Sequence, residues 1–416
     1  MAQPAERLAI TGWGCLTPLG KDPETTWEAV LAERSGISAV GDDWASDLPA
    51  RLAGRVEPGL TDELAPLLQR RLDRCAQLAL LAARQAWARA APHLCGVDPA
   101  RVAVVIGTGI GGLATLERQH TSLLTKGPAR VNPLTVPMLI PNAAAGQIAI
   151  DLGLHGGAHT PVSACASGAE ALLLAQLLLK DDRADVVLAG GTEAPVNRLG
   201  LVGFAAMRAL SCRNEAPELA SRPYGQERDG FVLSEGAGML VLQRERDVTT
   251  APSPPLGWLL ACGCSSDGHH IVAPEPEGLQ ASLAITDALR RADLAVSDLS
   301  FVQAHATGTP VGDLAESRAL RRSLGAALDS LPVTAPKGQL GHLLGAAGAV
   351  ETILALQSLR QGVVPRSLNA DPLDPEVDLA VVQGSSLALP QVSGERYALK
   401  NAFGFGGHNI SLILAA

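Results

Sequence analysis

A single cysteine stands where an extended run of residues ends and a helix-forming run begins. Cys165 follows the segment 160–164 and precedes an Ala- and Leu-rich stretch, 166–179. Small neighbours suit a sharp strand-to-helix turn that presents a nucleophile. Unpaired N–H groups and the positive end of the helix dipole favour a thiolate over a thiol. The pattern predicts a nucleophilic thiol with a depressed pKa; the alternative is a buried structural cysteine on a core helix.

Two histidines and a lysine stand at the ends of apolar runs, among glycines. His305 opens the segment 305–313, directly after a strand-like run. Lys337 and His342 lie in a second glycine-rich segment, 337–351. One histidine near glycines is usually a packing or capping residue. Two, in separate segments that also hold a lysine and a pair of threonines, are typical of a catalytic site.

A carboxylate and a third glycine-rich segment belong to the same pattern. Glu351 lies nine residues after His342, within a predicted helix, 345–360, of Ala, Leu and Val. A carboxylate buried there needs a cation or hydrogen-bond donors, and Lys337 is the obvious partner. The third segment, 401–409, resembles the other two in its glycines and its single histidine.

Composition restricts the class of protein. The chain has 416 residues, 47% of them hydrophobic, which is enough for two domains or one large duplicated core. A net charge of −9 disfavours a nucleic-acid binder. The seven cysteines are odd in number and scattered, which indicates a reducing compartment. Residues 1–7 carry no apolar signal region, and the apolar helix 171–179 is too short to span a bilayer. These features predict a cytoplasmic protein without membrane association.

Strand-like and helix-like runs alternate along the chain. Continuous apolar runs such as 102–106 are typical of strands covered on both faces, and the stretch 62–90 reads as one long helical region. The alternation predicts layered α/β structure with mostly parallel central strands. The second part repeats the layout of the first after a connector with three prolines, 249–255, so we expect two similar halves, 1–255 and 256–416.

Three further motifs could indicate cofactors or metals. The segment 107–112 matches G-x-G-x-x-G after a strand, as in dinucleotide-binding folds. No βαβ unit with an acidic residue about 20 positions on follows it, so we interpret it as a tight turn or pocket wall. Cys262-Gly263-Cys264 has no second cysteine pair nearby, and His269-His270 reads as a polar loop. We expect no metal site at either.

The motifs together resemble those of the β-ketoacyl-acyl-carrier-protein synthases, the elongating condensing enzymes of the thiolase-like fold. The resemblance runs nearly end to end, from Ile10-Thr11-Gly12 to the segment 404–409. It is most specific in the order and flanks of Cys165, His305, Lys337 and His342. It implies an α/β fold of five layers, α-β-α-β-α, built from two similar halves.

The resemblance implies a role for each central residue. Cys165 matches the nucleophile that accepts the acyl chain from carrier-protein phosphopantetheine. His305 and His342 match the pair that promotes decarboxylation of the malonyl thioester and stabilises the enolate. Lys337 matches the lysine that organises the histidines, with Glu351 as its partner.

Further residues have supporting roles by the same resemblance. The backbone N–H groups of Cys165 and Phe405 match the oxyanion hole, and Phe405 also matches a gating phenylalanine. Thr307 and Thr309 match the threonines that bind the pantetheine arm. The basic positions that meet an acidic carrier protein are matched by Arg70, Arg71 and Arg208. The residues that set the depth of the acyl pocket are matched by Phe204 and Met138.

The implied reaction is a decarboxylative Claisen condensation that extends an acyl chain by two carbons. Fatty-acid elongation is the first expectation, and the alternative is the ketosynthase subunit of a type II polyketide or polyene system, paired with a chain-length partner. The expected partners are acyl carrier protein and a second subunit, either a homodimer mate or that chain-length subunit. Neither a metal nor a redox cofactor is expected.

Three positions depart from the family pattern. Gly338 and Ala402 stand where the family often has serine, and Gly225 where it often has aspartate. They do not affect the four central residues, but they make the assignment to fatty-acid synthesis or to a polyketide or polyene pathway less specific. A non-catalytic chain-length subunit is disfavoured because Cys165 is present. An ester-forming acyltransferase would differ by releasing no CO₂ from malonyl-carrier protein.

Overall fold

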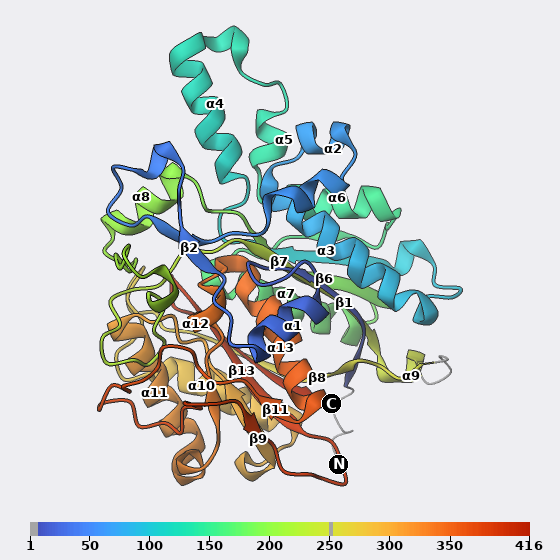
Figure 1. Ribbon diagram of the computed structural model, residues 1–416. Coiled ribbons are helices and arrows are strands. Elements are labelled where there is room, and N and C mark those ends of the chain that lie inside the picture. Colours follow the sequence, from blue (N-terminus) through green and yellow to red (C-terminus); the bar gives the residue numbers. More distant parts are fainter. Residues whose placement is uncertain (1–6, 249–252) are drawn as a thin grey trace.

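A central mixed sheet organises the chain (Figure 1). The computed structural model describes residues 7–248 and 253–416, and within them ten strands form one sheet in the order β10-β9-β13-β14-β8-β1-β7-β6-β4-β5. The strands are β1 (Leu8–Leu16), β4 (Val102–Gly107), β5 (Ala158–His159), β6 (Val186–Glu193), β7 (Gly236–Arg244), β8 (Gly257–Ser266), β9 (Leu299–Gln303), β10 (Val333–Thr334), β13 (Tyr397–Gly404) and β14 (His408–Ala415). Two small antiparallel pairs lie apart, β2 (Ile37–Ala39) with β3 (Leu52–Gly54) and β11 (Val363–Val364) with β12 (Leu387–Ala388).

The sheet consists of two five-stranded halves with the same topology. The order β5-β4-β6-β7-β1 in the first half is repeated as β10-β9-β13-β14-β8 in the second, with the same strand directions. Within the described part of the sheet, the halves join where β1 meets β8, over three residue pairs from Leu8–Leu259 to Ile10–Gly257. The expected duplicated architecture is confirmed.

The prediction of mostly parallel central strands is wrong. Among the strands of the described residues, β14, β8, β1 and β7 run antiparallel to their neighbours, and parallel pairs occur only toward the two edges. The last strand of each half lies between the first strand of that half and its parallel strands. This strand is β7, beside β1, in the first half and β14, beside β8, in the second. An antiparallel strand buried on both faces has the same continuous apolar sequence as a parallel one, so composition does not separate them.

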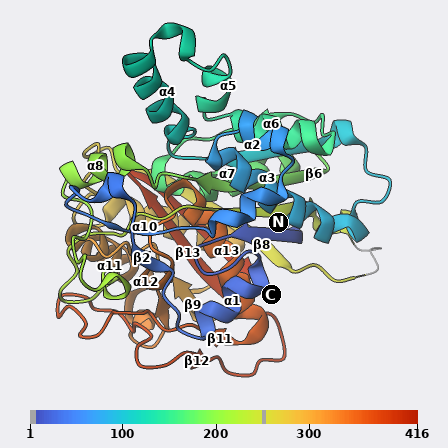
Figure 2. The ribbon, with the colours of Figure 1, turned by 45° about the horizontal axis from the view of Figure 1, so that its top comes forward.

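Helices complete five layers (Figure 2). Helices α7 and α13 pack against each other between the two halves of the sheet. Helix α3 covers the outer face of the first half, with α6 beside it, and α10 covers the outer face of the second, with α11 beside it. The helices of the described residues are α1 (Pro23–Leu31), α2 (Pro66–Arg71), α3 (Arg74–Ala90), α4 (Leu113–Lys126), α5 (Thr135–Leu139), α6 (Ala143–Leu152), α7 (Ser167–Lys180), α8 (Arg198–Ala206), α9 (Glu245–Val248), α10 (Leu279–Ala292), α11 (Pro310–Leu324), α12 (Lys337–Leu340) and α13 (Ala347–Gln361).

The two central helices begin at matching sharp turns. A residue with positive φ precedes each helix by a few positions, Ala164 (φ 50°) before α7 and Leu344 (φ 46°) before α13. Such a backbone costs roughly 1–3 kcal/mol in a residue with a side chain and persists only where packing enforces it. Here the packing is backbone against backbone, because a Cβ on Gly168 would lie 2.7 Å from the carbonyl oxygen of Gly345.

Gly168→Ala is expected to destabilise the protein by about 1–3 kcal/mol, because the added methyl group forces the two helix starts apart. Thermal unfolding measures the effect. The matched control is Gly146→Ala in α6, where a Cβ meets nothing within 4 Å. There the lower entropy of the unfolded chain should leave stability unchanged or slightly higher. Equal unfolding temperatures for the two variants would contradict the close approach.

Two other sequence predictions fall differently in the structure. The stretch 62–90 is not one helix, because Leu72 is extended and Asp73 caps a new helix by accepting from the backbone N–H of Cys75 at 3.0 Å. Residues 1–6 and 249–252 lie outside the described residues. Most of the N-terminal segment 1–7 and of the proline-containing connector 249–255, about which the sequence made predictions, therefore lies outside them too. The boundary at 255/256 therefore stays a prediction. Within the described chain, no helix has both the length and the apolar character needed to cross a membrane.

Candidate active site

One cavity of about 400 Å³ collects most of the residues singled out by the sequence. Cys165 contributes from the turn before α7, and the histidines contribute from loops of the second half of the chain. The predicted site residues that line the cavity are Cys165, His305, His342, Thr307, Thr309, Phe405 and Arg208. The two halves of the fold thus meet around a single space, with the nucleophile on one side and both imidazoles on the other.

Cys165 lies under the turn that joins β13 to β14. A Cβ on Gly404 would lie 2.4 Å from the carbonyl oxygen of Ser163 and 3.3 Å from the backbone nitrogen of Cys165, so only glycine lets this turn approach the cysteine. The backbone N–H groups of Phe405 and of Cys165 itself both act on the sulfur and favour its anionic form. This is the pair that the resemblance implies as an oxyanion hole.

The expectation of a depressed thiol pKa is wrong for the free protein. Burial raises the pKa of Cys165 to about 12, although the Lys337 ammonium and the two N–H groups act in the opposite direction. Glu193 adds to the rise. The sulfur is therefore a thiol at neutral pH and must lose its proton as it reacts. The sequence pattern identified the helix start correctly but contained no information on how deeply the sulfur is buried away from water.

His305 and His342 face each other edge to face, with ring centroids 5.5 Å apart and planes at 82°. Three buried ring nitrogens have no hydrogen-bond partner within the described residues. They are both nitrogens of His342 and Nδ1 of His305. Burial lowers the pKa of both imidazoles well below the ordinary value, and the nearby Lys337 and Lys400 lower it further. Both rings are neutral at neutral pH and can each accept or donate one proton.

A buried cluster of charges supports the histidine loops. Lys337 donates from Nζ to the carbonyl oxygen of His305 at 2.6 Å and pairs with Glu351 Oε1 at 2.5 Å. The other carboxylate oxygen of Glu351 lies 3.1 Å from Nζ of Lys400. All three side chains are essentially inaccessible to solvent. The predicted Lys337–Glu351 pair is thus present, together with a second lysine that the sequence analysis did not identify.

Two carboxylates of α11 hold the loop that carries His305. Glu316 accepts from the backbone N–H groups of His305 and Ala306, at 2.8 and 2.7 Å. Asp313 accepts from the backbone N–H groups of Thr307 and Gly308, at 3.0 and 3.1 Å. Because each carboxylate holds two successive N–H groups, the loop has little freedom to move the imidazole.

The threonines and the gate lie at the cavity wall. Thr307 and Thr309 are hydrogen-bonded to each other through their hydroxyls at 3.0 Å. Phe405 is partly buried at the tip of the β13–β14 turn. Arg208 is exposed at the same cavity. Arg70 and Arg71 are exposed at the end of α2 and do not line it.

The two acyl-pocket residues do not line this cavity. Phe204 packs edge to face on Phe231, at 5.5 Å between centroids, and Phe231 packs likewise on His342 at 5.2 Å. Phe204 belongs to the same apolar cluster as Cys165. Met138 is buried in α5, where its carbonyl oxygen lies against Gly112. The role of both residues in chain length stays a prediction.

The glycine-rich segment 107–112 binds a carboxylate of the protein itself. Glu193 accepts from the backbone N–H groups of Gly109 at 2.6 Å and Ile110 at 3.1 Å, and from the hydroxyl of Thr108 at 2.9 Å. It also accepts from the backbone N–H of Gly345 at 3.0 Å, which links the two halves of the fold. These N–H groups are occupied by Glu193, consistent with a tight turn rather than a dinucleotide site.

The structure places both motifs that were set aside as metal candidates. Nδ1 of His270 accepts from the backbone N–H groups of Val272 and Ala273, both at 3.1 Å, which shapes the loop beside the cavity. Cys262 is buried and Cys264 is exposed.

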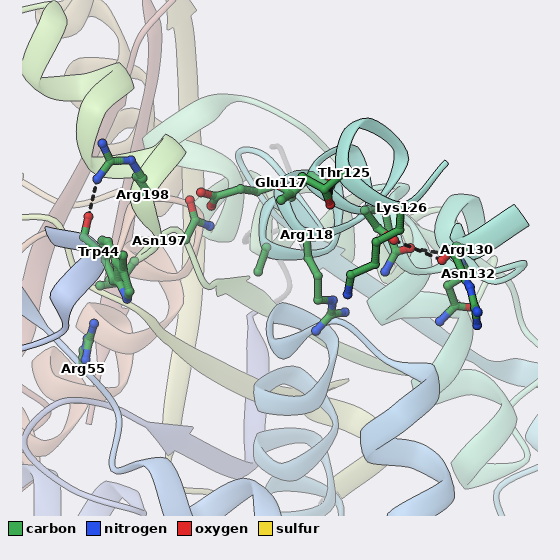
Figure 3. Close-up of a pocket in the computed structure, with 15 residues that line it drawn as sticks. Trp44, Arg55, Glu117, Arg118, Thr125, Lys126, Arg130, Asn132, Asn197 and Arg198 are labelled. Atoms are coloured by element: carbon green, nitrogen blue, oxygen red, sulfur yellow. Dashed lines mark hydrogen bonds between the residues drawn. The ribbon is translucent and has the colours of Figure 1, made fainter. Parts of the chain in front are cut away.

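A larger, more open cavity of about 710 Å³ lies between α4 and the body of the protein (Figure 3). It does not contain the nucleophile or either active-site histidine. One wall is α4, and the opposite wall includes Arg198, which donates to the carbonyl oxygen of Trp44 and pairs with Asp47 at 2.6 Å. Its charged side chains are mostly cationic: Arg55, Arg118, Lys126, Arg130 and Arg198, with Glu117.

The comparisons with known proteins cover nearly the whole chain. Residues 5–248 match the β-ketoacyl synthase N-terminal domain, and residues 256–371 match the C-terminal domain. The chain is 40% identical to 3-oxoacyl-[acyl-carrier-protein] synthase 2 of Mycobacterium tuberculosis, covering 97% of this chain and 96% of that one. It is 39% identical to the protein of that name from Staphylococcus aureus, covering 98% of each.

Solved structures show the same fold. A type II polyketide ketosynthase, solved with its acyl-carrier protein and bound to a hexaketide, has a TM-score of 0.90 at 27% identity, covering 99% of both chains. A β-ketoacyl synthase from Burkholderia phymatum has a TM-score of 0.88 at 30% identity, covering 98% of this chain and 99% of that one. With the thiol, the paired imidazoles and the duplicated five-layer fold in place, the chain belongs to the β-ketoacyl synthase family of condensing enzymes.

Proposed function

We propose that this enzyme joins an acyl thioester to malonyl-acyl-carrier protein, with loss of CO₂, and so extends the acyl chain by two carbons. The observation that carries the proposal is the shared cavity of Cys165, His305 and His342. A thioester exchange requires a soft nucleophile, and loss of CO₂ requires donors for an enolate oxygen. One thiol and two neutral imidazoles in a largely dry space supply both.

The first half-reaction transfers the acyl group. Sγ of Cys165 attacks the thioester carbonyl carbon, and the N–H groups of Cys165 and Phe405 stabilise the oxyanion. The thiol proton passes to a neutral imidazole in the cavity, since a sulfur with a pKa near 12 does not ionise beforehand. The proton ends on the departing pantetheine thiol, and the acyl group remains on the cysteine.

The second half-reaction forms the carbon–carbon bond. The malonyl carboxylate leaves as CO₂, and the electron pair of the broken bond forms the enolate of the thioester. One N–H group from each neutral ring, His305 and His342, stabilises the enolate oxygen. The enolate carbon attacks the acyl carbonyl on Cys165, and the C–S bond breaks to regenerate the thiolate, which takes up a proton from solvent.

Fatty-acid elongation is the pathway we propose first. The curated relatives at 39–40% identity are named 3-oxoacyl-[acyl-carrier-protein] synthase 2. A type II polyketide or polyene system is the second candidate. It is favoured by structural neighbours that include a ketosynthase solved with its chain length factor, the ishigamide pair, at a TM-score of 0.90 and 26% identity.

We further propose that the enzyme works in the cytoplasm with acyl carrier protein and a second subunit. Arg70, Arg71 and Arg208 are exposed cations available to an acidic carrier protein. The α4–α5 projection presents exposed apolar side chains, including Leu124, Val136 and Ile140, and suits a subunit contact in a homodimer or with a chain-length subunit (Figure 1). The chemistry requires no metal or redox cofactor, because side chains and backbone N–H groups provide each function it needs.

Mass spectrometry of the protein incubated with acyl-carrier proteins of several chain lengths tests the proposal. The expected result is an added acyl mass on the peptide that contains Cys165, followed by its loss and CO₂ release when malonyl-carrier protein is added. Acyl transfer without CO₂ release would indicate an ester-forming acyltransferase instead. Polyketide intermediates in place of a single two-carbon extension would identify the second pathway.

Phe405→Ala is expected to loosen control over acyl entry, because the ring lines the cavity at the tip of the turn above Cys165. Acylation rates measured across chain lengths should become more uniform, with the largest gain for the poorest substrates. The backbone N–H remains, so acylation itself should continue. Unchanged ratios between chain lengths would remove the gate assignment.

A further inference from the structure

A second buried lysine shares the carboxylate of the Lys337–Glu351 pair. Lys400 comes from β13 in the second half of the sheet, and its Nζ lies 3.1 Å from Glu351 Oε2, while Lys337 pairs with Oε1 at 2.5 Å. The side chains of Lys400 and Glu351 have no solvent-accessible area. Burying a charge is costly unless a partner neutralises it. Here one carboxylate serves two ammonium groups, which leaves one net positive charge on this three-residue cluster.

The cluster contacts the His305 loop through Lys337, and the charge of Lys400 is not needed to neutralise Glu351. Lys337 alone already neutralises the carboxylate and reaches the carbonyl oxygen of His305. Among the described residues, Glu351 is the one carboxylate that pairs with Lys400. The groups that act on Lys400 are Glu351 of α13, Lys337 of α12 and Glu316 of α11. Lys337 and Lys400 act on both rings, and His342 also acts on His305.

We propose that Lys400 is a positioning residue for the condensation: it gives the Lys337–Glu351–Lys400 cluster a net positive charge that adds to burial in keeping His305 and His342 neutral. The inference rests on the proposed function, because neutrality matters only if the rings must accept a proton and donate to an enolate. A protonated imidazole can no longer accept the thiol proton. A nearby fixed cation prevents that protonation without touching the substrate.

The electrostatics of the cluster agree with this role at working pH. Burial lowers the pKa of Lys400 to about 8, against the opposing effect of Glu351, so the side chain is mostly charged at neutral pH. Its charge lowers the pKa of both His305 and His342. Loss of the charge should therefore raise the imidazole pKa values, and the acid limb of any activity that needs neutral rings should move to higher pH.

The test is the pH profile of CO₂ release from malonyl-carrier protein in Lys400→Met, which keeps a long unbranched side chain and removes its charge. The acid limb of kcat should rise by about one pH unit, the size expected for one buried charge at an effective dielectric constant of about 20. Lys21→Met, which removes an exposed lysine, is the charge-matched control and should leave the limb in place. Thermal unfolding of each variant reports folding separately, and Lys400→Gln replaces Lys400→Met if that variant does not fold.

A double variant separates charge from packing. Lys400→Met with Glu351→Gln leaves Lys337 as the only ion, so the net charge of the cluster returns to its original value. The acid limb should return toward that of the unmodified enzyme, even if kcat is lower. If the limb is unchanged in Lys400→Met, or if the double variant shifts it further, Lys400 is merely structural and the inference is overturned. Failure of the unmodified enzyme to release CO₂ would instead overturn the proposed function.

Discussion

Cys165→Gln is expected to abolish acyl transfer to the protein while leaving decarboxylation of malonyl-carrier protein active. The substitution removes the only thiol among the described residues that line the cavity. The glutamine amide is no nucleophile, but it leaves His305, His342 and the backbone N–H groups in place. Because CO₂ release depends on those donors and not on the sulfur, the two half-reactions should separate. Acyl-enzyme mass and CO₂ release, measured on the same preparation, report them independently.

The exposed Cys264 provides the matched control for this variant. Cys264→Ser should keep both the acyl adduct and the condensation product, because its sulfur does not line the cavity. A Cys165→Gln enzyme that still elongates acyl chains would show that another residue is the nucleophile. If the Cys165→Gln enzyme loses both acylation and CO₂ release, the two half-reactions share more of the site than the geometry indicates.

His342→Ala is expected to reduce CO₂ release by about 10²–10³-fold, the usual cost of removing one donor from an oxyanion site. The ring is buried, and both of its nitrogens are without partners in the described residues, so the substitution breaks no internal hydrogen bond. Stability should therefore fall mainly through the cavity left against Phe231, and the catalytic loss should exceed what misfolding explains. Acylation of Cys165 should fall less, because its oxyanion is held by backbone N–H groups.

His155→Ala, at an exposed position, is the control and should match the unmodified enzyme. The pH dependence gives a second check, because the pKa of both active-site rings lies below the ordinary histidine value of about 6.5. Protonation of a ring removes a proton acceptor, so activity should persist below pH about 6.5 and decline only at more acidic pH. A decline centred on the ordinary histidine value would mean that the rings are solvated rather than buried.

Most of the site could be predicted because its polar residues stand at the ends of apolar runs. His305 lies two residues after the end of β9, and Cys165 lies two residues before the start of α7, which are positions that a fold holds rigidly. Lys337 and Glu351 could be paired because a carboxylate on an apolar helix has to find a cation. In each case, the local sequence indicated both the strand or helix and the polar residue beside or on it that required a partner.

Lys400 could not be found in the same way. It follows the apolar residues of β13 at a position where a lysine usually reaches solvent. Its burial depends on α13 lying across the strand, and no local pattern records that contact. The raised pKa of Cys165 was missed for a similar reason, since dryness is a property of the assembled halves. The same holds for Glu316, whose role depends on how α11 meets the His305 loop.

The division of the site between the two halves of the fold has a consequence during synthesis. A growing chain that has emerged through β6 already carries its thiol, but it lacks both rings and the Phe405 amide. It has neither a proton acceptor nor a complete anion cradle until the final hairpin pairs with β8. The complete site, with both rings and both anion-binding N–H groups, therefore forms only when the last strands have docked.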